Sequence, residues 1–355
     1  MATLKIRGGD LDLVEYEFNS FKPGEKVNPC GLKGDYHLTP SSSPVKAKVP
    51  GRIHLTVLDM NRFAPGHAGG GGIGFAIKVY AEVEVRCIAS GYNIKYSRPS
   101  IIRHFLHVIS DTLGYKGGFE VKAHDHEYKH VGLGSTCTIL TALASAVNKA
   151  LGNPLTSDQL RYLIGHNYVE ETTEGLVAFG FETGVGPAVS TYGGMAVLGD
   201  SLTVVYQQAF ANDKHVHIVI PKTSISSAGE EEFSLLMNRA RILDYRDREQ
   251  KAYCVLMDFI PSLQKNDLCK MGDVMWEIEF RGSKRAEIEH HSFEIYQYMN
   301  KLRKAGLEFV GMSSVGPSIA IITKRTAEEI SDLLQSNGLN IAFSTFVDNN
   351  GVVLE

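Results

Sequence analysis

The segment HVGLGSTCTILTALASAVNKALG, residues 130–152, restricts the fold more than any other part of this sequence. Its second half repeats apolar residues at three- and four-residue spacing between alanines, which predicts a helix that ends at the following Gly-Asn-Pro. The loop before this helix contains Gly132, Gly134, Ser135 and Thr136. Free backbone N–H groups and the helix dipole make such a loop a site for an anion, and a tight loop selected for packing alone is the alternative. The pattern lacks the Gly-Lys-Ser/Thr of a Walker loop.

The composition excludes several classes of protein. A chain of 355 residues is long enough for about two domains with a large core. A net charge of -4 argues against bulk electrostatic binding of nucleic acid, but it allows a local basic pocket for a phosphorylated small molecule. The five cysteines are widely spaced without a CxxC pair, which is typical of reduced thiols in a cytoplasmic protein. We expect no membrane span, because no apolar run reaches about 18 residues, and the N-terminus lacks a signal-peptide pattern.

The order of predicted elements favours an α+β fold, because strand and helix layers are separated without regular β-α-β alternation. Residues 1–45 form an N-terminal extension that is mostly loop, with one candidate strand at 11–18. A boundary near residue 210 separates a first domain, 46–210, from a second domain, 211–355. Helices are predicted near 99–113, 138–151, 156–170, 229–240, 248–262, 266–280 and 286–305.

The strand KVPGRIHLTVLDM contains the candidate catalytic residues Arg52, His54 and Asp59. Arg52 and His54 lie on one face of the strand, and Asp59 lies beyond it. The first two are candidates for holding a carboxylate or a phosphate, with a structural histidine as the alternative for His54. Asp59 is a candidate base, although a turn cap at Asn61 is favoured.

Three glycine-rich stretches accompany this strand. Four consecutive glycines at 69–72 lie between two predicted strands and favour a moving loop that lets the backbone approach a ligand. The stretch ETGVGPAVSTYGG, residues 182–194, precedes another strand. The segment VGMSSVGPSIAII, residues 310–322, predicts a strand, a glycine turn and a second strand.

Two groups of basic side chains have plain structural explanations. Arg281, Lys284 and Arg285 are expected to form a solvated basic turn, with a grip on a phosphate as the less favoured alternative. His124, His126 and His130 follow a strand into a loop without cysteine, so a metal site is disfavoured there.

In their order along the chain, these segments resemble the motifs of the GHMP kinase superfamily. HVGLGSTCTILTALASAV resembles its phosphate-binding motif, KVPGRIHLTVLDMN its first motif, and VGMSSVGPSIAII takes the place of its C-terminal glycine motif. The resemblance covers residues 46–355. It implies an S5-like N-terminal domain followed by a ferredoxin-like C-terminal domain.

Two departures from the kinases argue against phosphoryl transfer from ATP. Ser313-Ser314-Val315-Gly316-Pro317 replaces the usual glycine loop with bulkier residues and a proline. The segment at 182–194 lacks the aspartate that serves many of these kinases as a general base. An ATP-dependent small-molecule kinase is therefore the alternative function.

The motifs are more similar to a non-kinase branch, the β-ribofuranosylaminobenzene 5′-phosphate synthases and related C-glycoside synthases of C-nucleoside biosynthesis. The matching segments are Arg52-Ile53-His54-Leu55 with Asp59, Gly71-Gly72-Ile73-Gly74, Gly132-Leu133-Gly134-Ser135, Gly184-Val185-Gly186 and Ser313-Ser314-Val315-Gly316-Pro317. The resemblance implies that 5-phosphoribosyl 1-diphosphate and an aromatic acid combine with loss of diphosphate and CO₂. It also implies a homodimer that acts on small molecules, in methanopterin or C-nucleoside antibiotic biosynthesis.

The same resemblance assigns the site residues. Phosphate binding is expected of Gly71, Gly72, Gly132, Leu133, Gly134, Ser135, Thr136, Gly184, Gly186, Ser313, Ser314 and Gly316. Mg²⁺ is the expected counter-ion of the phosphates, held by Ser135, Thr136 and Glu170. Glu171, Glu174 and Glu182 are alternatives to Glu170.

Overall fold

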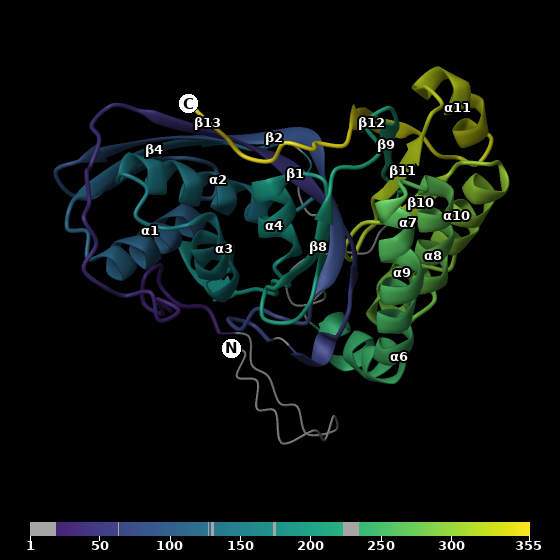
Figure 1. The fold of residues 1–355 in the computed structure, drawn as a ribbon, viewed down its shortest axis with the longest axis horizontal. Helices are drawn as coiled ribbons and strands as arrows, with labels where there is room; N and C mark the ends of the chain where they lie inside the picture. The colour runs from purple at the N-terminus through teal and green to yellow at the C-terminus, as the bar shows by residue number, and fades with distance from the viewer. Residues whose placement is uncertain (1–18, 63, 127, 129–130, 173–174, 223–233) are drawn as a thin grey trace.

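The computed structural model describes residues 19–355 except 63, 127, 129–130, 173–174 and 223–233 (Figure 1). The candidate strand at 11–18, His130 and Glu174 lie outside the described residues. Among the helices that are described, none is both long and apolar enough to cross a membrane.

The first domain is built on a seven-stranded sheet in which β2 is the organising strand. Along its length β2 pairs with β1, while its start pairs with β7 and its end pairs with β4. The sheet runs β13-β1-β2-β4-β3, with β7 and β8 attached at the start of β2. Its strands are β1 (Val45–Val57), β2 (Gly72–Ile88), β3 (Tyr92–Lys95), β4 (Gly118–His124), β7 (Met195–Leu198), β8 (Val204–Gln208) and β13 (Val353–Leu354).

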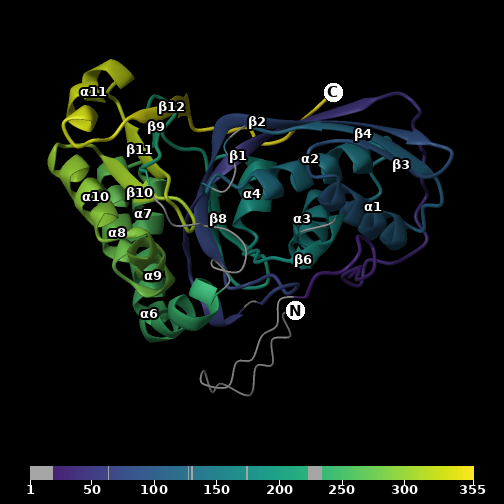
Figure 2. The same cartoon turned by 180° about the vertical axis from the view of Figure 1, so that it is seen from behind.

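Four helices cover one face of this sheet (Figures 1 and 2). They are α1 (Pro99–Leu113), α2 (Ser135–Ala150), α3 (Ser157–His166) and α4 (Val185–Tyr192). The predicted helix from 156 ends at His166, and Glu170 lies instead on β5 (Val169–Glu171), which pairs with β6 (Val177–Phe179). Helix α4 was not predicted, because Gly186 and Pro187 lower its apparent propensity, although proline is tolerated in a first helical turn.

The second domain has the strand order of a ferredoxin-like fold. Its antiparallel sheet runs β10-β11-β9-β12, which is the order 2-3-1-4 along the chain. The strands are β9 (His215–Val219), β10 (Phe309–Met312), β11 (Ile319–Thr323) and β12 (Ile341–Phe346), and α11 (Ala327–Gln335) connects the last two. The predicted α+β architecture of two such domains is confirmed.

A layer of helices lies between β9 and β10, where four helices were predicted. It consists of η4 (Leu235–Ala240), α6 (Arg241–Cys254), η5 (Val255–Phe259), α7 (Ile260–Gln264), α8 (Leu268–Glu279), α9 (Gly282–His291) and α10 (Glu294–Lys304). The first four are continuous, so the predicted break between the helices near 240 and 248 is absent. The predicted helix 286–305 is instead divided at Ser292, whose φ of 118° is not helical.

Both ends of the described chain return to the first domain. The chain leaves the first sheet after β8 and enters the second at β9, but β13 comes back to pair with β1. At the other end, Phe21 forms a backbone bridge to Val177 on β6. Asn28 and Asn167 exchange two hydrogen bonds of 2.8 Å. Residues 19–44 therefore lie along the helices of the first domain.

Candidate active site

Segments from both domains meet at the N-terminus of α2. The hydroxyl of Ser313 donates to the carbonyl of Gly132 over 2.7 Å and accepts from the backbone N–H of His54 over 3.1 Å. The N–H of Ser314 donates to the carbonyl of His54 over 2.7 Å. The glycine loop, β1 and the Ser313–Pro317 loop therefore form one hydrogen-bonded unit, although they are far apart in the sequence.

Two positions in the loop require glycine, because neighbouring segments approach the backbone closely there. A Cβ atom on Gly132, whose φ is +90°, would lie 2.3 Å from the carbonyl oxygen of Ser313. A Cβ atom on Gly134, whose φ is +70°, would lie 2.6 Å from Nε of Arg52. Any larger residue would push apart the elements that form the site.

A hollow with about 530 Å³ of empty space lies between these segments. Arg52 donates from Nη1 to the carbonyl of Gly132 over 3.1 Å, while its buried Nε has no hydrogen-bond partner among the described residues. The side chain of Arg52 lines the hollow, so its positive charge is suited to an anionic ligand group there. The lining residues are Arg52, Tyr128, Gly132, Leu133, Gly134, Ser135, Thr136, Tyr168, Glu170, Ser314, Val315 and Gly316.

Arg98 contacts this loop and was not identified from the sequence. Its guanidinium donates to the hydroxyls of Thr136 over 2.6 Å and Ser135 over 3.1 Å. The same group is held from behind by Asp125 at 3.0 Å and by the hydroxyl of Tyr96 at 2.8 Å. Arg98 is a single basic residue before the first turn of α1, and no local pattern marks it as part of a site.

Glu170 is the carboxylate that reaches the glycine loop. Thr136 donates its hydroxyl to Oε2 of Glu170 over 2.9 Å, and the hydroxyl of Tyr168 donates to Oε1. Burial, with the Glu170 charge beside it, raises the pKa of Tyr168 well above its usual value, so this hydroxyl keeps its proton.

The alternatives to Glu170 have other roles. Glu171 accepts from the backbone N–H of Ser100 over 3.4 Å at the start of α1. Glu182 is buried and accepts from the N–H of Gly184 over 2.8 Å. Burial raises the pKa of Glu182, and the nearby Arg52 charge opposes this shift.

The expected magnesium ligands converge, but a guanidinium already contacts them. Nη1 of Arg98 lies 2.6 Å from Oγ1 of Thr136 and 4.0 Å from Oε2 of Glu170, and Nη2 lies 3.1 Å from Oγ of Ser135. A divalent cation at the same three oxygens would face a fixed positive charge at close range. The arrangement therefore does not fit a protein-held Mg²⁺ while Arg98 keeps this position.

His54 and Asp59 do not line the hollow. The ring of His54 is buried, with Nε2 lying 3.2 Å from the hydroxyl of Thr183. Burial, with the charges of Arg52 and Lys284, lowers the pKa of His54 well below its usual value, so the ring is neutral. The carboxylate of Asp59 accepts from the N–H of Asn61 over 2.9 Å, as in the turn-cap alternative.

Four of the expected phosphate-binding glycines serve packing instead. A Cβ on Gly71 would lie 2.3 Å from the carbonyl of Leu198, and one on Gly72 would lie 2.6 Å from the carbonyl of Thr56. Both positions allow neighbouring strands to approach. Gly184 (φ +87°) and Gly186 allow α4 to pack closely, Gly184 against Leu198 and Leu202, and Gly186 against Cys137 of α2. None of the four lines the hollow among the described residues.

The basic turn at 281–285 was predicted to be solvated, which is wrong for Lys284. This side chain is fully buried, donates to the carbonyl of Ser314 over 2.8 Å and pairs with Glu287 over 3.2 Å. Glu279 accepts from the N–H of Met312 over 3.0 Å, and burial raises its pKa to about 7. Lys284 and Glu279 therefore hold the backbone in and next to the Ser313–Pro317 loop, a role that depends on tertiary packing.

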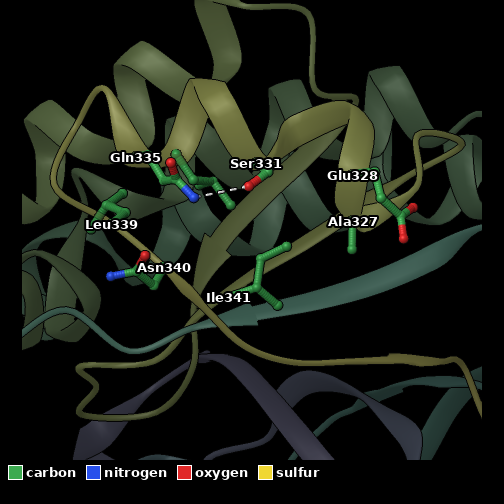
Figure 3. Close-up of a pocket in the computed structure, with 8 residues that line it drawn as sticks. Ala327, Glu328, Ser331, Gln335, Leu339, Asn340 and Ile341 are labelled. Carbon is green, nitrogen blue, oxygen red and sulfur yellow. Dashed lines mark hydrogen bonds between the residues drawn. The ribbon is translucent and has the colours of Figure 1, made fainter.

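A second hollow lies between α11 and β12 (Figure 3). Among the described residues, the eight that line it include no basic side chain. Its polar groups are those of Glu328, Ser331, Gln335 and Asn340, and Gln335 donates to Ser331 over 3.2 Å. Of these two hollows, the first alone combines a basic side chain, that of Arg52, with a helix N-terminus.

Solved structures with a similar fold belong to several enzymes. Mevalonate diphosphate decarboxylase from Staphylococcus aureus has a TM-score of 0.63 at 16% identity, with 88% of this chain and 98% of that chain covered. Homoserine kinase from Cytophaga hutchinsonii has a TM-score of 0.62 at 15% identity, with 88% and 97% covered. The chain therefore shares its fold with these enzymes, as expected from the resemblance of its motifs. No protein-family model matches the chain.

Sequence comparison makes the relationship more specific. Beta-ribofuranosylphenol 5′-phosphate synthase from Archaeoglobus fulgidus is 25% identical over 303 residues, which cover 80% of this chain and 89% of the relative. The synthase of the same name from Methanothermobacter thermautotrophicus is 27% identical over 296 residues, covering 77% and 87%. The chain therefore resembles these synthases over most of its length, as its motifs predicted.

Proposed function

We propose that this enzyme is a C-glycoside synthase. It joins 5-phosphoribosyl 1-diphosphate to a carboxylated aromatic or heteroaromatic acid, with release of diphosphate and CO₂. The observation that carries the proposal is the hollow at the N-terminus of α2, which Arg52 lines and whose Ser135 and Thr136 hydroxyls accept hydrogen bonds from Arg98. Such a site suits two anionic substrates side by side.

The glycine loop is the place for the phosphates of the donor. Helix α2 begins at Ser135, and Gly132 to Thr136 line the hollow, so the free N–H groups and the positive end of the helix dipole lie at its wall. As the C1–O bond of the donor breaks, the leaving diphosphate keeps the electron pair. Hydrogen-bond donors of the loop that are already in place stabilise the charge of the diphosphate, and they need no reorganisation in the transition state.

Arg52 is the place for the carboxylate of the acceptor. The ring carbon that bears the carboxylate attacks C1 with a π electron pair and forms the new C–C bond. The bond to the carboxylate then breaks, CO₂ leaves, and the electron pair of that bond restores the aromatic ring. Arg52 orients this carboxylate beside the glycine loop that holds the diphosphate, so the two substrates are held next to each other.

Apolar side chains protect the reacting centre from water. Leu133 and Val315 are 2% and 5% exposed and line the hollow from opposite domains. Water would otherwise capture the cationic ribosyl centre, so exclusion of water favours transfer to the acceptor over hydrolysis.

Release of CO₂ from carboxyl-labelled acceptors, with 5-phosphoribosyl 1-diphosphate as donor, tests the proposal. 4-Hydroxybenzoate as acceptor would indicate methanopterin biosynthesis, and an aminopyrazole dicarboxylate would indicate C-nucleoside biosynthesis. Hydrogen-bonded sites reject analogues that lack the matching group, so one acceptor should exceed the other strongly. Release from neither acceptor would reject both assignments.

An ATP-dependent kinase is the alternative for this fold, and the absence of an aspartate from residues 182–194 counts against it. Incubation with radiolabelled ATP and candidate alcohols would show robust phosphorylation if the alternative were correct. Mg²⁺ as counter-ion, a homodimer and a cytoplasmic location stay predictions. Sedimentation of the purified protein tests the second of these.

A further inference from the structure

We propose that Arg98 is the cation that the glycine loop presents to the diphosphate of the donor. We also propose that Glu170 occupies the position of that anion when no donor is bound. The identity of the anion rests on the proposed function, whereas the assignment of the two side chains rests on geometry. In place of the expected metal held by Ser135, Thr136 and Glu170, the protein supplies a guanidinium of its own.

Two hydrogen-bond donors and one cation surround the carboxylate of Glu170. They are the hydroxyl of Thr136 at 2.9 Å, the hydroxyl of Tyr168 and the guanidinium of Arg98 at 4.0 Å. Two hydroxyls and a cation gathered on one carboxylate form the donor set that a phosphate oxygen takes. The side chain of Glu170 is 39% exposed, so it is able to leave the site toward solvent when a stronger anion enters.

Arg98, in contrast, is held in place. Its side chain is 11% exposed, pairs with Asp125 at 3.0 Å and lies over the ring of Tyr96 at 5.6 Å. A guanidinium stays charged at all accessible pH values, and its planar fork donates in fixed directions. Nε of Arg98 is also buried without a partner among the described residues, so its charge is not fully used by the protein.

The charges around the loop explain why the two residues work as a pair. Asp125 neutralises Arg98 from behind, and Glu170 faces it from the loop side. An anion that entered while Glu170 stayed in place would be repelled by that carboxylate. Departure of Glu170 removes this repulsion and leaves Arg98 directed at the ligand.

Binding of inorganic pyrophosphate, measured by isothermal titration calorimetry in EDTA and again with Mg²⁺, tests the assignment. We expect wild-type protein to bind in EDTA and Arg98→Met to bind about tenfold to a hundredfold more weakly, because a charge-assisted hydrogen bond is lost. Arg98→Lys should recover part of the affinity, since it keeps the charge without the fork. Glu170→Gln should bind more tightly than the wild type, because the competing charge is removed.

Arg86→Met is the matched control, because Arg86 is a half-exposed arginine that pairs with Glu120 on the sheet, away from the loop. It should bind pyrophosphate as the wild type does. Pyrophosphate binding that requires Mg²⁺ and weakens in Glu170→Gln would overturn the assignment and make Glu170 a metal ligand. If circular dichroism shows that Arg98→Met is unfolded, Arg98→Lys and Glu170→Gln decide the question.

The outcome also separates this inference from the proposed function. No CO₂ release from any acceptor, together with the expected order of pyrophosphate affinities, would reject the synthase and keep Arg98 as the anion-binding residue. Turnover with unchanged pyrophosphate binding in both Arg98 variants would keep the synthase and reject the role of Arg98.

Discussion

Arg52 and Arg98 are the two side chains on which the chemistry of this site depends. They differ in whether a sequence motif identifies them. Arg52 lies in a strand motif and was identified before the fold was known. Its unpartnered Nε, beside Gly134, explains why that motif and the glycine loop occur together. Arg98 belongs to no motif, yet it makes hydrogen bonds to both hydroxyls of the loop.

Replacing Arg52 by methionine tests the acceptor role at the residue scale. We expect turnover of the acid to fall about tenfold to a hundredfold, because one charge-assisted hydrogen bond to the carboxylate is lost. Pyrophosphate affinity should stay near that of the wild type, since Arg98 is unchanged. Steady-state CO₂ release and calorimetry measure the two effects. Equal loss of both would show instead that Arg52 binds the donor.

His104, a buried histidine on α1, makes stability depend on pH. Its Nδ1 accepts from the N–H of Gly24 over 3.2 Å, and burial lowers its pKa to about 4. Because the folded state disfavours the protonated ring, this stabilisation is present above the unfolded pKa of about 6.5 and is lost as the pH falls toward 4. The full shift corresponds to roughly 3 kcal/mol.

The matching variant is His104→Leu, which has no ring to protonate. We expect the free energy of unfolding in urea to fall less between pH 7 and pH 5 in this variant than in the wild type. The comparison between variants is needed because Glu279, whose pKa is raised to about 7, acts in the opposite direction. An equal pH dependence in both proteins would contradict the role of His104.

At the scale of elements, the hairpin of β5 and β6 connects the N-terminal extension with the site. Phe21 exchanges backbone hydrogen bonds of 2.8 and 3.0 Å with Val177 on β6, and its ring packs against Phe179 at 4.8 Å. Glu170 is paired with Ala178 on the same hairpin. The extension therefore supports the strand that carries the carboxylate at the glycine loop.

Phe21→Ala tests this support. Because Phe21 is only 3% exposed, we expect a loss of about 3–5 kcal/mol in the free energy of unfolding. Amide hydrogen exchange in residues 169–179 should also accelerate, because the hairpin loses its packing partner. Phe293→Ala, at a ring that is 65% exposed, is the control and should change neither. Unchanged exchange in the hairpin would show that the extension does not support it.

At the scale of the whole molecule, the two domains share a hydrophobic cluster, in which Phe75 packs against Phe309, and they are hydrogen-bonded to each other at the site. Ser313 links the carbonyl of Gly132 with the N–H of His54, and Lys284 supports the neighbouring carbonyl of Ser314. Return of β13 to β1 ties the end of the chain to the first sheet (Figure 2). The hollow is therefore shaped by the relative position of the domains.

Ser313→Ala removes the hydroxyl that joins the domains. We expect a loss of about 1–3 kcal/mol in the free energy of unfolding, because a buried donor and a buried acceptor lose their partner. Ser318→Ala is the matched control, since Ser318 is equally buried and its hydroxyl has no partner among the described residues. Equal effects of the two substitutions on urea unfolding would show that the Ser313 hydrogen bonds do not stabilise the contact.

The sequence alone was sufficient for the two-domain α+β fold, the loop before α2 and the position of Arg52. These depend on local properties, namely helical periodicity, the conformations that only glycine adopts readily, and the alternation of a strand. Only the tertiary structure placed Glu170 on a strand, buried Lys284 beneath a loop and brought Arg98 to Ser135 and Thr136. Such contacts join side chains that are about 30 or more residues apart. They arise from the packing of helices and hairpins on a sheet, which no local pattern records.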